Sequence, residues 1–294
     1  MSFRAGIASV LALLAGCTFT VTPSDTHPGT NDGRGDHIVV VPERIVHDEL
    51  FVWFPGSGGK PDSARALLEA VGDEGMRAIG LAYENVVSVH DLCLGSTDPQ
   101  CPAKVRGERL DGIDRTDLVD VDPVNSIAGR LYNLLTYLDS RYPNGGWDAY
   151  LDGSEPRWDR IVVAGASQGS GMAAMIAKHR LVARVVMFAG VFDVDPTTFA
   201  PPHFDPAPWI TTGHVTPSDR YYGFGHVDDN AQVYLANWAE LGVPGPVASV
   251  DQDDPPYGGA HALQTARAAS TPHGSWKRPI FEPVWRYTCC YGLP

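Results

Sequence analysis

The sequence predicts an α/β fold: a mostly parallel central sheet flanked by helices, with long loops over the carboxyl edge. Short apolar runs alternate with amphipathic helical patterns along the chain. Several runs are continuous, as expected for strands that are buried on both faces. We expect strands at 37–41, 50–54, 78–83, 160–165, 182–189, 220–226 and 246–251, and helices at 63–71, 123–141, 168–179 and 230–241.

The composition excludes two broad classes of protein. The chain has 294 residues and a formal net charge of −13, from 22 Lys and Arg against 35 Asp and Glu. Nonspecific nucleic-acid binding needs a basic surface, so we expect no nucleic-acid partner. The hydrophobic fraction of 44% suffices for a packed core. No apolar run reaches about 18 residues, which excludes a multi-pass membrane protein.

The start of the chain is typical of an export signal. Arg4 gives a positive charge, and the apolar stretch 5–15 is too short to span a bilayer but suits the core of a signal peptide. Residues 14–17 (Leu-Ala-Gly-Cys) resemble a bacterial lipobox, in which the Cys is lipidated before the signal is removed. The resemblance implies a signal peptide at 1–16 and lipidation of Cys17. The protein would then be an exported lipoprotein with a membrane anchor, in the outer membrane or at the cell surface.

The remainder divides by composition into two parts. Residues 17–36 are rich in Thr, Pro, Gly and Asp and have little to bury, which predicts a flexible tether. Residues 37–294 carry the strand and helix patterns without an internal repeat, which predicts a single domain.

Four cysteines are left if Cys17 carries a lipid. Export favours disulfides, and Cys93 and Cys101 lie close together in one loop, so we expect them to form a bridge. Cys289 and Cys290 would form either a vicinal bridge or free thiols. Because no C-x-x-C or H-x-x-x-H pattern accompanies these residues, we expect no metal site.

Ser167 is the candidate nucleophile. It is the centre of a G-x-S-x-G motif that follows an expected strand and opens an expected helix. In this context the serine lies on a sharp turn with its hydroxyl directed out of the sheet. Gly165 and Gly169 remove side chains where the helix crowds the strand.

A glycine-rich loop follows the expected strand 50–54. Such a loop can contribute one backbone N–H to an oxyanion hole, and the residue after the nucleophile contributes another. We therefore expect the N–H groups of Ser57 and Gln168 to stabilise an oxyanion. The alternative, a phosphate-binding loop, lacks the G-x-x-x-x-G-K-[ST] spacing.

The general base and its acid should follow Ser167 in the order acid, then His. His261 follows the last expected strand and precedes a helix, so we assign it as the base. Asp228 or Asp229 is the acid; spacing barely separates them, and a G-x-x-D match favours Asp228. Weaker candidates are Asp193 and Asp195 for the acid, and His90, His179, His203, His214, His226 and His273, by chain order, for the base.

Together these motifs resemble the α/β-hydrolase superfamily over about residues 45–270. More narrowly, they resemble secreted bacterial hydrolases with a P-G-[ST]-G-G-x-P loop, S-Q-G at the nucleophile and P-P-[YF]-G-G-x-H at the histidine. Ala166 and Ser170 stand where many such proteins have His and Gly, which leaves the substrate preference open.

The resemblance implies hydrolysis of a small-molecule or polymer carboxylic ester through an acyl-enzyme on Ser167, with no metal or organic cofactor. The irregular stretches 84–121 and 190–219 would line the mouth of the site, and 252–294 is also expected to be irregular. Aromatic and proline residues in 190–219 suit an apolar ester, or belong to a stiffened surface loop. A peptidase or lipase with the same residues, and a non-catalytic envelope binding module, are the alternative functions.

Overall fold

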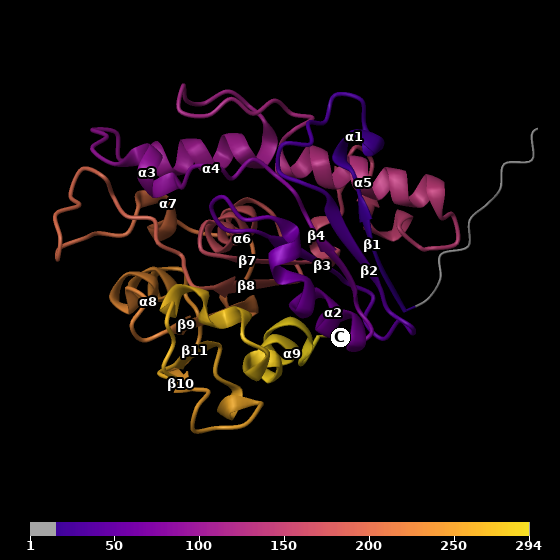
Figure 1. Cartoon of the computed structure of the whole chain (residues 1–294). Coiled ribbons are helices and arrows are strands. Elements are labelled where there is room, and N and C mark those ends of the chain that lie inside the picture. The colour runs from indigo at the N-terminus through magenta and orange to yellow at the C-terminus, as the bar shows by residue number, and fades with distance from the viewer. Residues whose placement is uncertain (1–15, 294) are drawn as a thin grey trace, which may run out of the picture.

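A computed structural model describes residues 16–293, so most of the expected signal peptide lies outside the described residues. One sheet of nine strands forms the centre of the molecule, in the order β1-β2-β4-β3-β7-β8-β9-β11-β10 (Figure 1). Strand β2 runs antiparallel to both of its neighbours, and the pairings from β4 to β10 are parallel. This arrangement is the α/β-hydrolase fold, and the predicted fold class is confirmed.

The strands are β1 (Cys17–Val21), β2 (His37–Val41), β3 (Leu50–Phe54), β4 (Arg77–Gly80), β7 (Ile161–Ala166), β8 (Arg184–Phe188), β9 (Tyr221–His226), β10 (Val247–Ser249) and β11 (Ala262–Thr265), with β5 (Leu151–Asp152) and β6 (Glu155–Pro156) forming a separate pair.

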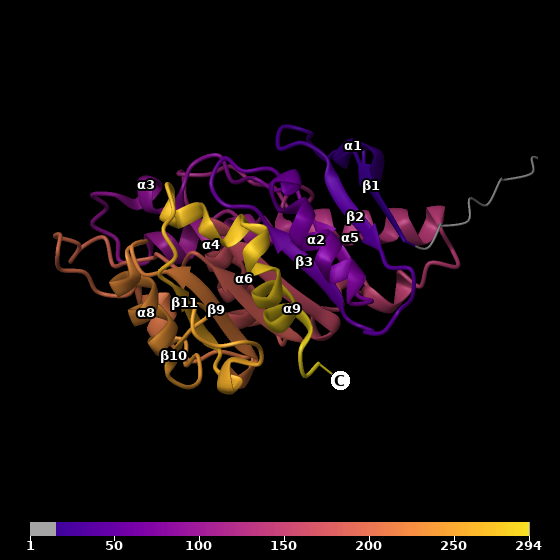
Figure 2. The same cartoon turned by 60° about the horizontal axis from the view of Figure 1, so that its bottom comes forward.

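Helices cover both faces of the sheet. Helices α2 and α9 lie side by side over one face, and α5, α6 and α8 cover the other (Figure 2). No helix of the described residues is long and apolar enough to cross a membrane. The helices are α1 (Pro23–Thr26), α2 (Arg65–Asp73), α3 (Val89–Cys93), α4 (Cys101–Asp111), α5 (Ile127–Arg141), α6 (Gln168–His179), α7 (Pro208–Thr211), α8 (Ala231–Glu240) and α9 (Glu282–Cys290).

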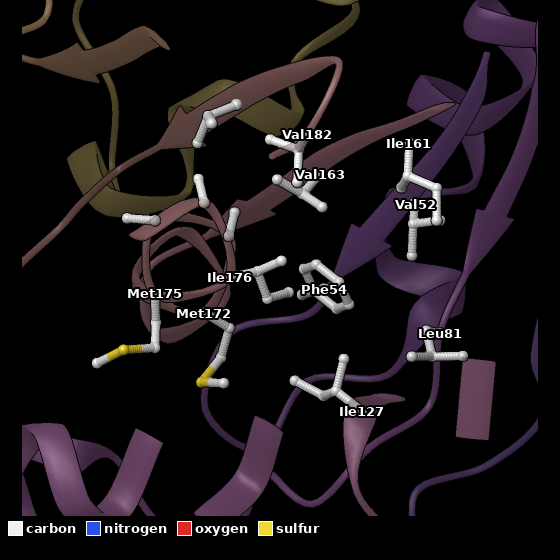
Figure 3. Close-up of a cluster of buried hydrophobic side chains, with 14 of the residues drawn as sticks. Val52, Phe54, Leu81, Ile127, Ile161, Val163, Met172, Met175, Ile176 and Val182 are labelled. Carbon is white, nitrogen blue, oxygen red and sulfur yellow. The ribbon is translucent and has the colours of Figure 1, made fainter. Parts of the chain in front are cut away.

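Each strand of the centre supplies side chains to two hydrophobic cores. In β3, Val52 and Phe54 belong to the core under α5 and α6, whereas Trp53 belongs to the core under α2 and α9. This alternation follows from the two-residue period of a strand. Figure 3 shows Phe54 packed near Met172 and Ile176 of α6. Burial on both faces explains why the sequence of β3 is a continuous apolar run.

The predicted flexible tether at 17–36 is wrong. Strand β1 pairs with β2 in antiparallel register from Cys17–Val41 to Val21–His37. The C-T-F-T-V sequence alternates in the manner of a half-buried edge strand: Val21 is buried and Phe19 packs against Tyr142. Composition suggested a linker because threonine and proline are common there. The short alternation was the better signal, and residues 17–36 belong to the domain.

The chain between and after the expected strands holds more regular structure than predicted. Helices α3 and α4 lie within 84–121, and β11 and α9 lie within 252–294. The Cys93–Cys101 bridge is confirmed and joins α3 to α4. Cys289 and Cys290 form the vicinal bridge that the sequence left open.

The turn between β7 and α6 depends on two glycines at a very close backbone approach. A Cβ on Gly169 would lie 1.9 Å from the carbonyl oxygen of Phe54, and a Cβ on Gly165 would lie 2.4 Å from the oxygen of Gly169. Neither distance admits a methyl group. The first turn of α6 therefore lies directly on β3 and β7, as the G-x-S-x-G motif predicted.

We predict that Gly169→Ala lowers the free energy of unfolding by about 3 kcal/mol or more, because the backbone of β3 has no room to move away. Gly213→Ala is the matched control, since a Cβ at Gly213 meets nothing within 4 Å. That change should cost within about 0.5 kcal/mol. Urea unfolding of both variants measures the difference, and a loss below about 1 kcal/mol for Gly169→Ala would contradict the packing argument.

Candidate active site

Ser167 occupies the turn between β7 and α6 in a strained backbone conformation. Its φ is 55° and its ψ is −120°, values that cost a non-glycine residue of the order of 1–3 kcal/mol. The turn is held from both sides. Ser167 N–H donates to Phe188 O at 2.9 Å, and the buried Ser170 hydroxyl donates to Ser167 O at 2.5 Å. Ser170 thus supports the turn.

A cavity of about 580 Å³ opens beside Ser167. We call it the main cavity. It lies at the carboxyl edge of the sheet, where loops from β3, β7, β8, β9 and β11 meet. Its lining includes Ser57, Ser167, Gln168, Asp229 and His273. In a parallel α/β sheet this edge is the expected place for a binding site.

His273 and Asp229 form a close pair in the main cavity. His273 Nδ1 lies 3.0 Å from Asp229 Oδ1 and 2.9 Å from Oδ2. The Asp229 side chain is 7% exposed and that of His273 is 49% exposed. The pairing fixes the imidazole with Nδ1 toward the carboxylate, and Nε2 remains for exchange of a proton. The His273 ring also packs on Phe192, with centroids 5.7 Å apart.

The assignment of His261 as the base is wrong. His261 immediately precedes β11, at the amino end of the strand, and therefore lies at the opposite edge of the sheet from Ser167. Its Nδ1 contacts Tyr221 O at 3.0 Å, and its ring stacks on Tyr222 at 3.9 Å. Burial lowers the pKa of His261. It lines a separate cavity of about 500 Å³.

The error comes from an unrecognised strand. The last strand that the sequence predicts is 246–251, but β11 follows it in the chain and inserts between β9 and β10. The loop after β11 carries His273, which therefore follows Ser167 and Asp229 in the chain, as the motif requires of a candidate base. The short apolar run Ala262–Thr265 was the available signal.

The structure also separates the two candidate acids. Asp228 was favoured by spacing, but its side chain is 75% exposed and lies 3.8 Å from His226 Nδ1. Asp229, the alternative, is the residue that meets His273. His226 is turned to Arg267 O at 2.9 Å. The G-x-x-D match thus favours the exposed aspartate rather than the one that pairs with His273.

Ser57 and Gln168, the expected oxyanion residues, lie together. The Ser57 hydroxyl donates to Gln168 Oε1 at 3.3 Å, and Val89 N–H donates to the same oxygen at 3.1 Å. Among the described residues, the backbone N–H groups of Ser57 and Gln168 have no acceptor. Two unpaired N–H groups beside a serine hydroxyl fit the binding of a developing negative oxygen.

Asn85 holds the glycine-rich loop in position. Its Nδ2 donates to Gly56 O at 2.6 Å and to Gly59 O at 3.0 Å. Its backbone carbonyl accepts from Gly58 N–H at 2.8 Å. Arg34 Nε in turn donates to Asn85 Oδ1 at 2.9 Å. This support was not predicted, because Arg34 lies in the stretch expected to be a tether.

A buried ion pair joins the two long segments 84–121 and 190–219. Arg106 of α4 and Asp193, after β8, have side chains that are 2% and 4% exposed. Arg106 Nη1 also donates to Gln168 O at 3.0 Å, and Trp209 Nε1 donates to Asp193 Oδ2 at 2.9 Å. The carboxylate of Asp193, a weaker candidate for the acid, is therefore already paired with Arg106 and Trp209. The pair lines the main cavity and leaves no uncompensated charge on that wall.

Comparison with known proteins gives only distant matches. No family model and no curated protein matches the sequence. Among solved structures, the apo form of Thermogutta terrifontis esterase 2 is 12% identical, with 90% of this chain and 87% of that one covered and a TM-score of 0.42. XC6422 from Xanthomonas campestris, an α/β serine hydrolase without a lid, is 12% identical with 97% and 98% covered and a TM-score of 0.44. Esterase B from Lactobacillus rhamnosis is 12% identical with 93% and 85% covered and a TM-score of 0.47.

We predict that Arg106→Met lowers the free energy of unfolding by about 3–5 kcal/mol, because it leaves the Asp193 carboxylate buried without its countercharge. The double variant Arg106→Met/Asp193→Leu should recover most of that loss. As a control, Arg65→Met removes an exposed pair with Asp62 and should cost at most about 1 kcal/mol. Equal losses in the single and double variants, measured by urea unfolding, would contradict the assigned role of the pair.

Proposed function

We propose that the chain is a serine hydrolase that cleaves carboxylic esters, with Ser167 as nucleophile, His273 as general base and Asp229 as the orienting acid. One observation carries the proposal: a serine in a strained turn and a hydrogen-bonded Asp–His pair line the same cavity. Strain of this kind persists where the surrounding structure enforces it, and it is concentrated at functional sites.

The mechanism follows from the chemistry of these groups. His273 Nε2 accepts the proton of the Ser167 hydroxyl while Oγ attacks the ester carbonyl carbon. The N–H groups of Ser57 and Gln168 donate to the oxyanion. The alcohol leaves with the proton from His273, and water, deprotonated by the same imidazole, then releases the acid and restores Ser167. Asp229 stabilises the imidazolium without accepting its proton.

An uncharged, apolar ester suits the main cavity best. Arg106 is the cation in its wall, and Asp193 neutralises it. The lining also includes Phe192, Phe199 and Phe204. Burial of aromatic and aliphatic groups drives the binding of such ligands, with a few polar groups to orient them.

We also propose that Cys17 is lipidated and anchors an exported protein. The support is the resemblance of residues 14–17 to a lipobox. Cys17 is the free cysteine among the described residues, and it begins the edge strand β1. Mass analysis of the mature N-terminus tests the anchor, and an unmodified Cys17 would contradict it.

The first functional prediction concerns the nucleophile and its base. A fluorophosphonate probe should form an adduct on Ser167 that is absent in Ser167→Ala. For ester turnover, His273→Ala should reduce kcat by about 10³–10⁶-fold, because the serine loses its base. His261→Ala is the matched control and should change kcat by no more than about threefold, since this histidine lies at the other edge of the sheet. Folded protein that neither labels nor hydrolyses any ester would favour a non-catalytic binding module.

The second functional prediction separates the adjacent aspartates. Asp229→Asn should lower kcat by up to about 10⁴-fold, because the amide no longer holds the imidazole in the required tautomer. Asp228→Asn should have little effect, since its exposed carboxylate does not contact His273. Steady-state kinetics on one ester compares the two, and equal losses would reject Asp229 as the orienting acid.

A further inference from the structure

A second, smaller cavity adjoins the main cavity. Its volume is about 210 Å³, and we call it the side cavity. Val89 and His90 of α3 line both cavities, as do Phe192 and Phe199 from the loop after β8. The two cavities therefore share a wall. It is made by the segments 84–121 and 190–219, which the Arg106–Asp193 pair joins.

The side cavity is apolar. The residues that line only the side cavity include Leu94, Pro102, Pro196 and the disulfide-bonded Cys93. Among the described residues that line it, Asp193 is the one carboxylate, and that group already accepts hydrogen bonds from Arg106 and Trp209. The Asp193 carboxylate is therefore not free to bind a polar ligand, and burial of apolar surface is the main interaction that the side cavity can supply.

Two aromatic rings form part of the shared wall. His90 and Phe199 meet edge to face, with ring centroids 5.4 Å apart and planes at 86°. Phe199 is half-buried and lies on a loop rather than on a helix or strand. Because the two rings come from separate segments, a side-chain rotation of Phe199 would change this wall without any change in the sheet.

The wall that carries His90 is braced by the disulfide. Cys93 and Cys101 join α3 to α4 with a Cα–Cα distance of 5.8 Å. Val89, Cys93, Cys101 and Val105 form a small buried cluster of their own. Helix α3 has five residues, too few to be stable alone, so the bridge and this cluster fix its position beside the cavities.

We propose that the side cavity is a binding subsite for a bulky apolar group of the substrate, such as one aromatic ring or a short branched chain. An apolar protein cavity of about 150 Å³ holds a benzene ring, so the side cavity has room for a group of this size. The substrate class would then be esters with an aryl or branched aliphatic part on either the acyl or the alcohol side. This inference rests on the proposed esterase function.

The test compares kcat/KM for p-nitrophenyl 3-phenylpropionate with that for p-nitrophenyl acetate. Leu94 lines the side cavity but not the main cavity, and Leu94→Trp should fill it. The ratio of the two values should fall by about 10-fold or more. Leu181→Trp is the matched control, because Leu181 is another exposed leucine that lines neither cavity, and the ratio should not change.

A second variant tests the shared wall, in case the new tryptophan turns toward solvent. Phe199→Ala should raise kcat/KM for esters bulkier than the 3-phenylpropionate, relative to the acetate, because the two cavities become continuous. The same comparison with 3-phenylpropyl acetate and ethyl acetate shows whether the acyl or the alcohol side enters the subsite.

The outcomes separate the two proposals. A wild-type chain that hydrolyses esters, with ratios unchanged within twofold in both Leu94→Trp and Phe199→Ala, would overturn the subsite and leave the esterase intact. A folded wild-type chain with no turnover of any ester and no labelling of Ser167 would instead overturn the proposed function.

Discussion

The contact between the first turn of α6 and the end of β3 is the constraint on which the nucleophile and the proposed oxyanion donors depend. Gly169 lies where no side chain would fit against Phe54 O, and the register of β3 and β7 pairs Phe54 with Gly165. This close approach forces Ser167 into its strained conformation. It also brings the loop that follows β3 beside the start of α6, so Ser57 and Gln168 become neighbours. One backbone contact therefore positions both the nucleophile and the proposed oxyanion donors.

The remaining groups depend on long-range packing rather than on that turn. Asp229 and His273 follow β9 and β11, which are neighbours in the sheet although far apart in sequence. The segments 84–121 and 190–219, which line the cavities, are joined by the pair Arg106 and Asp193, 87 residues apart. A buried pair of this kind contributes little net stability over an apolar substitute, but it penalises any arrangement that separates the charges. It thus favours one geometry of the cavity wall.

The parts that sequence reasoning predicted correctly are those encoded locally. The turn at Ser167 follows from the G-x-S-x-G spacing, and the central strands follow from continuous apolar runs. His273 was ranked below His261 because β11 is four residues long and owes its existence to pairing with β9 and β10. Asp228 and Asp229 are adjacent and chemically identical. The direction in which the chain turns after β9 decides which of them faces His273, and the sequence does not encode that direction locally. Asn85 and Arg106 have no local signature, since their roles come from distant partners.

The order found in residues 17–36 has a consequence for how the chain tolerates shortening. A fragment that starts at residue 37 would lose β1 and with it the cover of β2, whose H-I-V-V-V sequence is buried along its whole length. An uncovered apolar edge strand recruits other chains, so the fragment would aggregate during expression. It would also lack Arg34, which holds Asn85 against the loop of Ser57. Proteolytic trimming that appears to remove only a linker would therefore damage both solubility and the cavity.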